Sequence, residues 1–446
     1  MDYPVIEFSL LGNGMVIGLV AFIHVLISHG VAIGGTAMMV SLEYRAYKTN
    51  NKRLDQFART LSKWVLIVTT TAGAITGVGI WFTTMVITPE SIGSLLRIFF
   101  WAWFAEWIVF VTEVSLLLLY YYTWDKWKGA KKNIHLRVGY ALVGFSWLTA
   151  AIITGVLAAK LTPGLWTETL SFWNAFFSPT YVPSLLFRTF IAILLAVSFI
   201  SIIVKMRVKD NALQQEVFGV FGKWMAVTIP SLLIFGVWYL FKIPEQAYDQ
   251  VIWSTGMEPG VFTTINILGL AVLIIYALWA IKLPKKVPVI LVFIVWAASI
   301  GFVGEFEMVR ESVRKPYVIY DYLYANGIPA SKAEEFSEEG FLENWTFATV
   351  DEVTEETKYE AGRNLYEAQC LACHSIDGWR SRRAFADRVA GWGEDSLADY
   401  IETMHISRPF MPPFVGTEEE REALAHYITS EVDQANGEVA KGGDEQ

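Results

Sequence analysis

The chain has 446 residues, of which 54% are hydrophobic, and it contains 18 Trp, 19 Tyr and 29 Phe. Its mean hydropathy of +0.39 is typical of a polytopic membrane protein and argues against an ordinary soluble enzyme. The net charge of −9 comes largely from acidic clusters near the C-terminus, and no basic domain or motif indicates nucleic-acid binding.

Eight apolar segments, each of about 20 residues or more, are long enough to cross a bilayer. Asp2 and Glu7 stand where a secretory signal would carry basic residues, so the first segment is expected to remain as a transmembrane helix. It is also long enough to include a tilted or interfacial piece. The eight segments lie near residues 12–42, 64–87, 95–122, 136–158, 183–204, 217–241, 261–281 and 288–309.

Basic residues are concentrated in alternate loops between these segments. One set of loops holds eighteen Lys and Arg, whereas the opposite set holds four: Arg97, Lys160, Arg188 and Lys242. By the positive-inside rule the first set is cytoplasmic. Eight crossings then place both termini outside, and we predict a bacterial inner-membrane protein whose C-terminal domain is extracytoplasmic.

Two histidines lie in the first segment, where a polar group is costly and therefore a functional candidate. His24 and His29 are five residues apart, roughly 140° round a helix, so they face different directions. We expect His24 to bind a haem iron, because neutral imidazole is a common haem ligand; packing alone is the alternative. His29 would serve a second haem, a quinone site or a helix–helix hydrogen bond.

Glu106 and Glu113 lie seven residues apart in the third segment and share one helix face. Paired carboxylates facing a bundle interior suit a weak haem ligand, a proton path, or both. The alternative is a pair of hydrogen-bonded structural acids.

Ionisable residues also crowd the outer end of the eighth segment. They form either an interfacial ion-pair cluster or a haem site, with a carboxylate at the iron and arginines pairing the haem propionates. Arg97 and Arg188, also expected near the outer face, fit the propionate role. The crowded residues are Glu305, Glu307, Arg310, Glu311 and Arg314.

The C-terminal part contains Cys370-Leu371-Ala372-Cys373-His374, and C-x-x-C-H is the attachment signature of a c-type haem. The two thiols can add to the haem vinyl groups, and His374 can reach the iron. These are the only cysteines of the chain, so none is left for a structural disulfide. The alternative, half of a zinc site, needs a second Cys/His pair at ligand spacing, and none is obvious.

The residues around this motif resemble a small cytochrome c domain from about 358 to 435. Residues 361–366 resemble the N-terminal helix of that family, and residues 417–428 resemble its closing helix. Met411-Pro412-Pro413-Phe414 resembles the loop that presents the sixth, methionine ligand, which implies that Met411 completes the coordination of haem c. Met404 and His405 are close enough to compete for that role.

The membrane part, roughly residues 10 to 320, resembles subunit I of cytochrome bd quinol oxidases. Residues 73–82 resemble the signature of the family's second helix, and His24 stands at its first-helix haem ligand. Glu106 and Glu113 resemble the third-helix acids near the high-spin haems, with a spacing one residue shorter.

Two further stretches carry the same resemblance. His135 matches a histidine at the start of the family's fourth helix. Residues 311–317 resemble its G-R-Q-P-W stretch with the preceding glutamate, which implies that Glu311 is a haem ligand and that Arg314 lies beside it.

The chain also departs from that family. The histidine and methionine that bind the low-spin haem are missing from the candidate region 186–190, and no histidine occurs between His135 and His374. The long outer quinol-binding loop is absent as well. The low-spin haem site is therefore absent or built from other residues, and the resemblance does not extend to the quinol site.

We predict an all-α protein: a membrane bundle of about eight transmembrane helices, both termini outside, plus a small all-α cytochrome c domain. The predicted domains are a transmembrane haem domain (1–316), a polar connector (317–357), the cytochrome c domain (358–436) and a disordered tail (437–446).

The predicted function is that of a membrane-bound haem b/c electron-transfer subunit of a respiratory oxidoreductase. The alternatives are a bd-type terminal oxidase that receives its electrons through haem c, and a haem-free membrane anchor for the cytochrome c domain. The expected cofactors are one covalent haem c and one or two haems b, with haem d possible at one site. The expected partners are a second membrane subunit, periplasmic cytochromes c and quinol, without nucleic acid.

Overall fold

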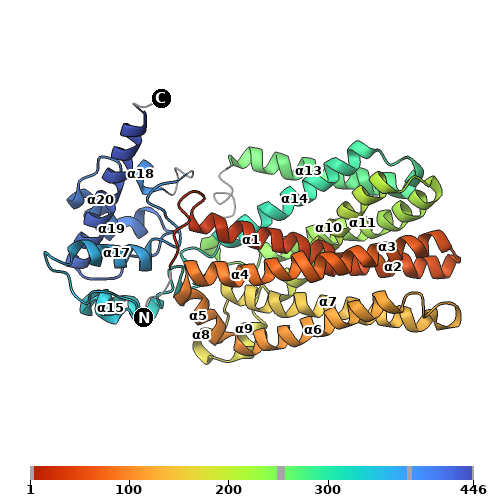
Figure 1. Cartoon of the computed structure of the whole chain (residues 1–446), viewed down its shortest axis with the longest axis horizontal. Helices are drawn as coiled ribbons and strands as arrows, with labels where there is room; N and C mark the ends of the chain where they lie inside the picture. The colour runs from red at the N-terminus through yellow and green to blue at the C-terminus, as the bar shows by residue number, and fades with distance from the viewer. Residues whose placement is uncertain (1–4, 249–256, 379–383, 444–446) are drawn as a thin grey trace. The chain divides into compact units, whose positions relative to one another are not determined.

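The computed structural model describes residues 5–248, 257–378 and 384–443, the stretch 438–443 for its backbone alone. Helices make up nearly all of the regular structure (Figure 1). The chain divides into two compact units. Unit 1 comprises Met1–Ala21, Val78–Ile98 and Arg314–Gln446, and unit 2 comprises Phe22–Gly77 and Phe99–Val313.

All eight predicted spans are confirmed as helices long and apolar enough to cross a membrane. The first span consists of α1 (Asn13–Ile27), η1 (Ser28–Ile33) and α2 (Gly34–Thr49), and the second of α3 (Lys52–Val68), η2 (Thr69–Gly73) and α4 (Ala74–Ile87). The others are α6 (Phe100–Thr123), η3 (Gly129–Lys131) continued by α7 (Lys132–Leu161), α10 (Tyr181–Arg207), α11 (Asn211–Leu240), α13 (Pro259–Lys282) and α14 (Val289–Ser312).

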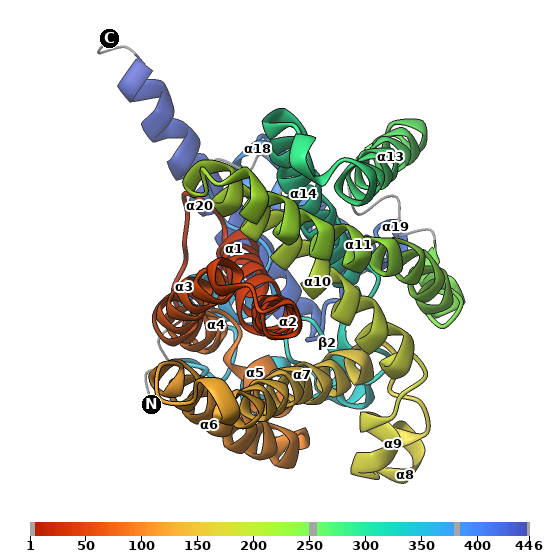
Figure 2. The ribbon, with the colours of Figure 1, turned by 90° about the vertical axis from the view of Figure 1, so that its right-hand side faces the viewer.

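Helix α10 is the inner helix of unit 2. It contacts η1, α2, α7, α11 and α14, and Figure 2, which looks along the bundle, shows it among them. A Cβ atom on Gly34 would come within 1.9 Å of the carbonyl oxygen of Ala192 in α10. Glycine is therefore required where the first span crosses this helix.

The first two spans are each interrupted by a π-helical turn. These turns, η1 and η2, contact each other. Single π turns inside α-helices are often found at functional sites. His29 lies in η1, and Thr76 lies three residues after the end of η2.

A buried polar network joins α2, α6 and α7 near the loops that carry the basic residues. Glu43 is fully buried; it accepts hydrogen bonds from the Tyr120 hydroxyl and from His135 Nδ1, the latter at 2.5 Å, and it pairs with Lys132 at 2.7 Å. The Nε2 atom of His135 lies 2.9 Å from the Tyr120 carbonyl oxygen. Both ring nitrogens of His135 are thus engaged in holding three helices together.

Short elements connect the long helices. In unit 2 they are α8 (Trp166–Thr169), α9 (Phe172–Phe176), η4 (Glu245–Ala247) and η5 (Pro284–Lys286). In unit 1, α5 (Pro89–Ile98) is followed by the connector elements β1 (Tyr317–Ile319), β2 (Leu323–Tyr324), η6 (Ala330–Lys332), α15 (Ala333–Glu339) and α16 (Phe341–Asn344). Strands β1 and β2 pair antiparallel.

The C-terminal domain is helical, as predicted, with α17 (Lys358–Gln369), α18 (Phe385–Arg388), α19 (Glu394–Ser407) and α20 (Glu418–Gly443). Helices α17 and α20 pack together, and a Cβ atom on Gly362 would come within 2.1 Å of the Ala423 carbonyl oxygen. Glycine therefore allows this close crossing. Helix α20 runs through Gly443, so its backbone is helical over part of the stretch predicted as a tail.

Candidate haem sites

One turn presents the three residues of the C-x-x-C-H motif. Helix α17 ends at Gln369, and the backbone N–H groups of Cys373 and His374 both donate to the Cys370 carbonyl, at 3.0 and 2.9 Å. Neither cysteine forms a disulfide, and burial raises the pKa of the Cys370 thiol to about 12. A raised thiol pKa is unlike a redox-active C-x-x-C pair, in which the thiolate is favoured.

The segment before α1 and the first residue of that helix hold this turn in place within unit 1. Asn13 is almost fully buried; its side-chain amide donates to the carbonyls of Leu371 and Ile6, each at 3.1 Å, and its oxygen accepts from Phe8 N at 2.8 Å. Glu7 accepts from the backbone N–H of Ile376 at 3.1 Å. Sequence patterns could not predict this contact, because the two segments are more than 350 residues apart.

The loop that carries Met411 is also anchored. The backbone N–H of Met411 donates to the Arg408 carbonyl at 2.8 Å, and the Gln369 side chain makes two hydrogen bonds with the backbone of Val415. The His374 ring stacks on Phe385 with centroids 4.8 Å apart. His405 Nδ1 is buried without a hydrogen-bond partner among the described residues, so His405 has a ring nitrogen free to bind a metal.

A zinc site finds no support here. Within the ranges that the structure describes, no group of three or more His, Cys, Asp and Glu side chains is placed to hold a metal ion. The residues around Cys370 and His374 thus fit a covalent haem and lack the ligand set of a zinc site.

His24 is oriented by the second span. Its Nδ1 atom lies 3.1 Å from the Thr76 hydroxyl, and that hydroxyl donates its own proton to the Ala72 carbonyl at 2.7 Å. The hydroxyl oxygen is therefore an acceptor for Nδ1–H, which leaves the lone pair of Nε2 free for a metal. Gly77 faces the same ring, since a Cβ atom there would come within 3.1 Å of it.

Glu106 and Glu113 differ in their surroundings. Glu113 is buried and accepts hydrogen bonds from Ser146 at 2.6 Å and Thr149 at 3.2 Å, both on α7. Glu106 is partly exposed and makes no hydrogen bond within the described part of the chain. Glu113 fits a hydrogen-bonded acid, whereas Glu106 keeps its carboxylate available for a ligand or a proton.

Arg188 lies in a buried charge cluster between η1, α10 and α14. Its guanidinium donates to Glu307 at 3.2 Å and towards His29 Nε2 at 3.4 Å, and Arg310 pairs with the other oxygen of Glu307 at 2.7 Å. The Nε atom of Arg188 is buried and has no hydrogen-bond partner among the described residues. Since His29 Nδ1 also lies 3.1 Å from Ser28 Oγ, His29 fits the predicted helix–helix hydrogen bond and has no free nitrogen for iron.

Aromatic side chains fill the space beside this cluster. The Phe187 ring packs against Phe306 at 5.0 Å and Phe302 at 6.1 Å, and the Arg188 guanidinium lies over Phe306. Arginine and phenylalanine thus occupy the region 186–190, in which the sequence offered no ligand for a low-spin haem.

The remaining candidates lie near the end of α14 and on α5. Glu311 is exposed, and Arg314 is buried with a guanidinium nitrogen 3.3 Å from the Val318 carbonyl. Glu305 accepts from Asn266 at 2.7 Å. Arg97 is exposed on α5. Arg97 and Arg314 belong to unit 1, and Arg188 and Glu311 to unit 2.

Eight apolar spans joined to a C-x-x-C-H domain define a membrane haem protein of the electron-transfer class. Residues 357–428 match the family model described as cytochrome c oxidase, cbb3-type, subunit III. Together with the motif, this match identifies a cytochrome c domain, which binds haem c. A search of curated proteins finds no match.

Among solved structures, the bd oxidase from Geobacillus thermodenitrificans is similar, with a TM-score of 0.52 and 14% sequence identity. The similarity covers 69% of this chain and 89% of that chain. At this identity the likeness concerns the fold alone. It confirms the predicted architecture, a bd-oxidase-like helical bundle followed by a cytochrome c domain.

Proposed function

We propose that this protein is a membrane-bound haem b/c electron-transfer subunit of a respiratory oxidoreductase. One observation carries the proposal: in a bundle with the fold of a bd oxidase, Thr76 fixes the tautomer of His24 with Nε2 free, and the same chain ends in a cytochrome c domain. Haem iron supplies one-electron chemistry to the protein that binds it.

The residues divide into four groups. His374 and Met411 hold haem c, and Cys370 and Cys373 attach it. His24 and Glu311 are iron ligands of the noncovalent haem b, of which we expect one or two. Glu106 and Glu113 hold or move protons. The fourth group consists of the arginines that pair with haem propionates: Arg188, Arg314 and Arg97. The unsatisfied Nε donor of Arg188 supports its place in that fourth group.

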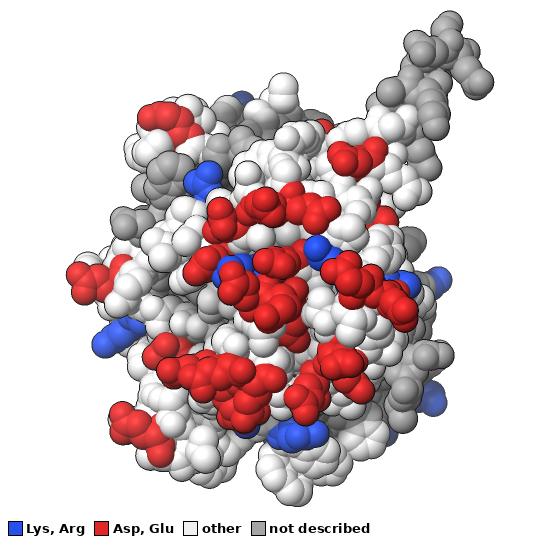
Figure 3. Space-filling view, turned by 90° about the vertical axis from the view of Figure 1, so that its left-hand side faces the viewer, with Lys and Arg blue, Asp and Glu red and all other residues white. Residues whose placement is uncertain are grey.

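We place the protein in a bacterial inner membrane with its basic loops in the cytoplasm and the cytochrome c domain outside. A second membrane subunit, a periplasmic cytochrome c and quinol are the proposed partners. Acidic side chains gather on the face of unit 1 drawn in Figure 3, and no basic residue occurs between residues 333 and 357, where nine acids are exposed. This charge favours a cationic protein as the external partner.

The test is a reduced-minus-oxidised spectrum of the purified full chain, repeated under CO, with haems b and c counted. We expect both haem types, and His24→Ala should lose noncovalent haem while keeping haem c. His426→Ala is the matched control, because His426 pairs with Glu394 on the C-terminal domain. Haem c as the sole haem would overturn the proposal and leave a membrane anchor.

The CO arm separates electron transfer from oxygen reduction. The proposed subunit has no iron with an open coordination position, so its noncovalent haem should not bind CO. Noncovalent haem that binds CO would instead favour a bd-type terminal oxidase fed through haem c, and oxygen uptake would then be assayed. The unpartnered carboxylate of Glu106 is the feature that keeps this second function in consideration.

A further inference from the structure

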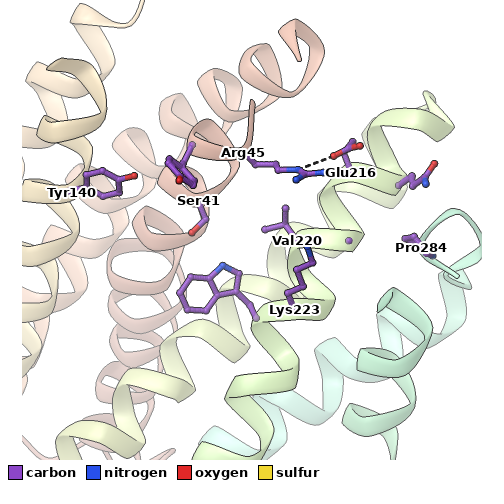
Figure 4. A pocket seen from close by; sticks show the side chains of 11 residues that line it. Ser41, Arg45, Tyr140, Glu216, Val220, Lys223 and Pro284 are labelled. Carbon is purple, nitrogen blue, oxygen red and sulfur yellow. Dashed lines mark hydrogen bonds and ion pairs between the residues drawn. The ribbon is translucent and has the colours of Figure 1, made fainter. Parts of the chain in front are cut away.

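A pocket of about 440 Å³ opens in unit 2 between α2, α7, α11 and η5, and none of the haem ligands proposed above lines it. Figure 4 shows Arg45, Tyr140, Glu216 and Lys223 around it. The loops that follow α2 and precede α7, α11 and α14 belong to the basic set, so the pocket lies at the basic end of this unit.

The lining carries one uncompensated positive charge. Arg45 Nε pairs with Glu216 at 3.3 Å, which neutralises both groups. Lys223 is exposed and has no ion-pair partner within the described part of the chain. The hydroxyl of Tyr140, whose side chain is also exposed, makes no hydrogen bond there either. An ammonium group and a hydroxyl donor are therefore available to a singly charged anion.

The face of α11 below Lys223 is apolar. Val227 and Ile234 fall within about 40° of Lys223 around the helix axis, and they are 54% and 61% exposed. Trp224 lines the pocket beside Lys223. Tyrosine, tryptophan and lysine at the end of an apolar stripe are the arrangement found at membrane–water interfaces.

We propose that this pocket binds the headgroup of an anionic phospholipid. Lys223 pairs with the phosphodiester, Tyr140 donates a hydrogen bond to it, and the acyl chains lie along Val227 and Ile234. One spare cation matches the single charge of a phosphodiester, and basic pockets between membrane helices are suited to such headgroups. The apolar stripe favours a lipid over free phosphate, since a soluble anion would make no use of it.

The experiment compares the detergent-solubilised, delipidated full chain with Lys223→Ala, Lys223→Arg and Lys209→Ala variants. Lys209 is an exposed lysine of the loop before α11 that does not line the pocket. The probe is phosphatidylglycerol, titrated against the thermal unfolding midpoint, with phosphatidylcholine and inorganic phosphate in parallel. We expect stabilisation by phosphatidylglycerol alone, about fivefold weaker binding for Lys223→Ala, and wild-type binding for Lys209→Ala and Lys223→Arg.

Two results would overturn the proposal. Equal binding of phosphatidylglycerol by the Lys223→Ala and Lys209→Ala variants would mean that the pocket is not the lipid site. Stabilisation by inorganic phosphate at the same concentrations, or by phosphatidylcholine to the same extent, would show that the pocket does not select an anionic lipid. Neither result depends on the haem content of the protein.

Discussion

The cytochrome c domain and the membrane bundle hold their cofactor residues in different ways. In the cytochrome c domain, Cys370, Cys373 and His374 lie on a single turn, and Met411 lies on the anchored loop between α19 and α20. In the membrane bundle, the candidate residues come from α1, α6, α10 and α14 and depend on how these helices pack. Covalent attachment tolerates small displacements of the fold, whereas a noncovalent haem does not. Variants that disturb helix packing should therefore lose noncovalent haem from the bundle while the C-terminal domain keeps its haem c.

The largest effect is expected from Glu307→Gln. This change leaves the buried guanidinium of Arg188 and its neighbour Arg310 without the carboxylate they share. Removing one partner of a buried ion pair typically costs about 3–5 kcal/mol. Thermal unfolding of the detergent-solubilised chain would measure this as a lower midpoint, with haem c retained.

Glu305→Gln is the matched control, since Glu305 lies on the same helix and, among the described residues, accepts from Asn266 alone. It should leave the midpoint close to that of the wild type. An unchanged midpoint in Glu307→Gln would contradict the structural role of this ion pair, whatever the variant does to the propionate contact proposed for Arg188.

Met411 and His405 are the two residues compared as the sixth ligand of haem c. We expect Met411→Ala to remove the absorption band of methionine-ligated ferric haem and to lower the reduction potential, because thioether sulfur favours the reduced iron. His405→Ala should leave both unchanged. The opposite pattern would identify His405, whose Nδ1 is unsatisfied, as the ligand.

The sequence predicts features that depend on apolar length or on adjacent residues, but not those that depend on tertiary contacts. The eight spans could be predicted because apolar length alone defines them, and the C-x-x-C-H motif because its chemistry needs adjacent residues. Thr76 could not be assigned to His24, nor Asn13 to Leu371, because each pairing depends on tertiary contacts between distant segments. The π turns η1 and η2 also left no pattern in the hydropathy.

A smaller effect is expected from Thr76→Val, which removes the acceptor of His24 Nδ1–H but keeps the shape of the side chain. Loss of an outer-shell partner typically weakens metal binding about 10–100-fold. Retention of noncovalent haem through repeated washing would report this loss, and Thr76→Ser should restore it. Thr83→Val is the control, because the Thr83 hydroxyl donates to the Gly79 carbonyl and does not contact His24. Normal haem retention in Thr76→Val would show that Thr76 does not orient His24 for haem binding.

The smallest effect concerns the contact between α5 and the connector in unit 1, where no haem ligand is involved. Trp345 Nε1 donates to Glu90 at 2.9 Å, and burial raises the pKa of the Glu90 carboxyl above its ordinary value of 4.5. The folded chain then binds the proton more tightly than the unfolded chain. Stability therefore falls as pH rises from the ordinary pKa through the raised one.

Glutamine resembles the protonated carboxyl and keeps an acceptor for Trp345, so Glu90→Gln should be neutral or stabilising at pH 7, by less than about 1 kcal/mol. Its advantage over the wild type should vanish at acidic pH, where Glu90 is itself protonated. Glu90→Leu removes the acceptor as well and should destabilise unit 1 at both pH values, because the Trp345 N–H would be left unpaired. Unfolding midpoints at pH 4 and pH 7 measure all three. A stabilisation by glutamine that persisted at acidic pH would show that relief of the buried charge is not its cause.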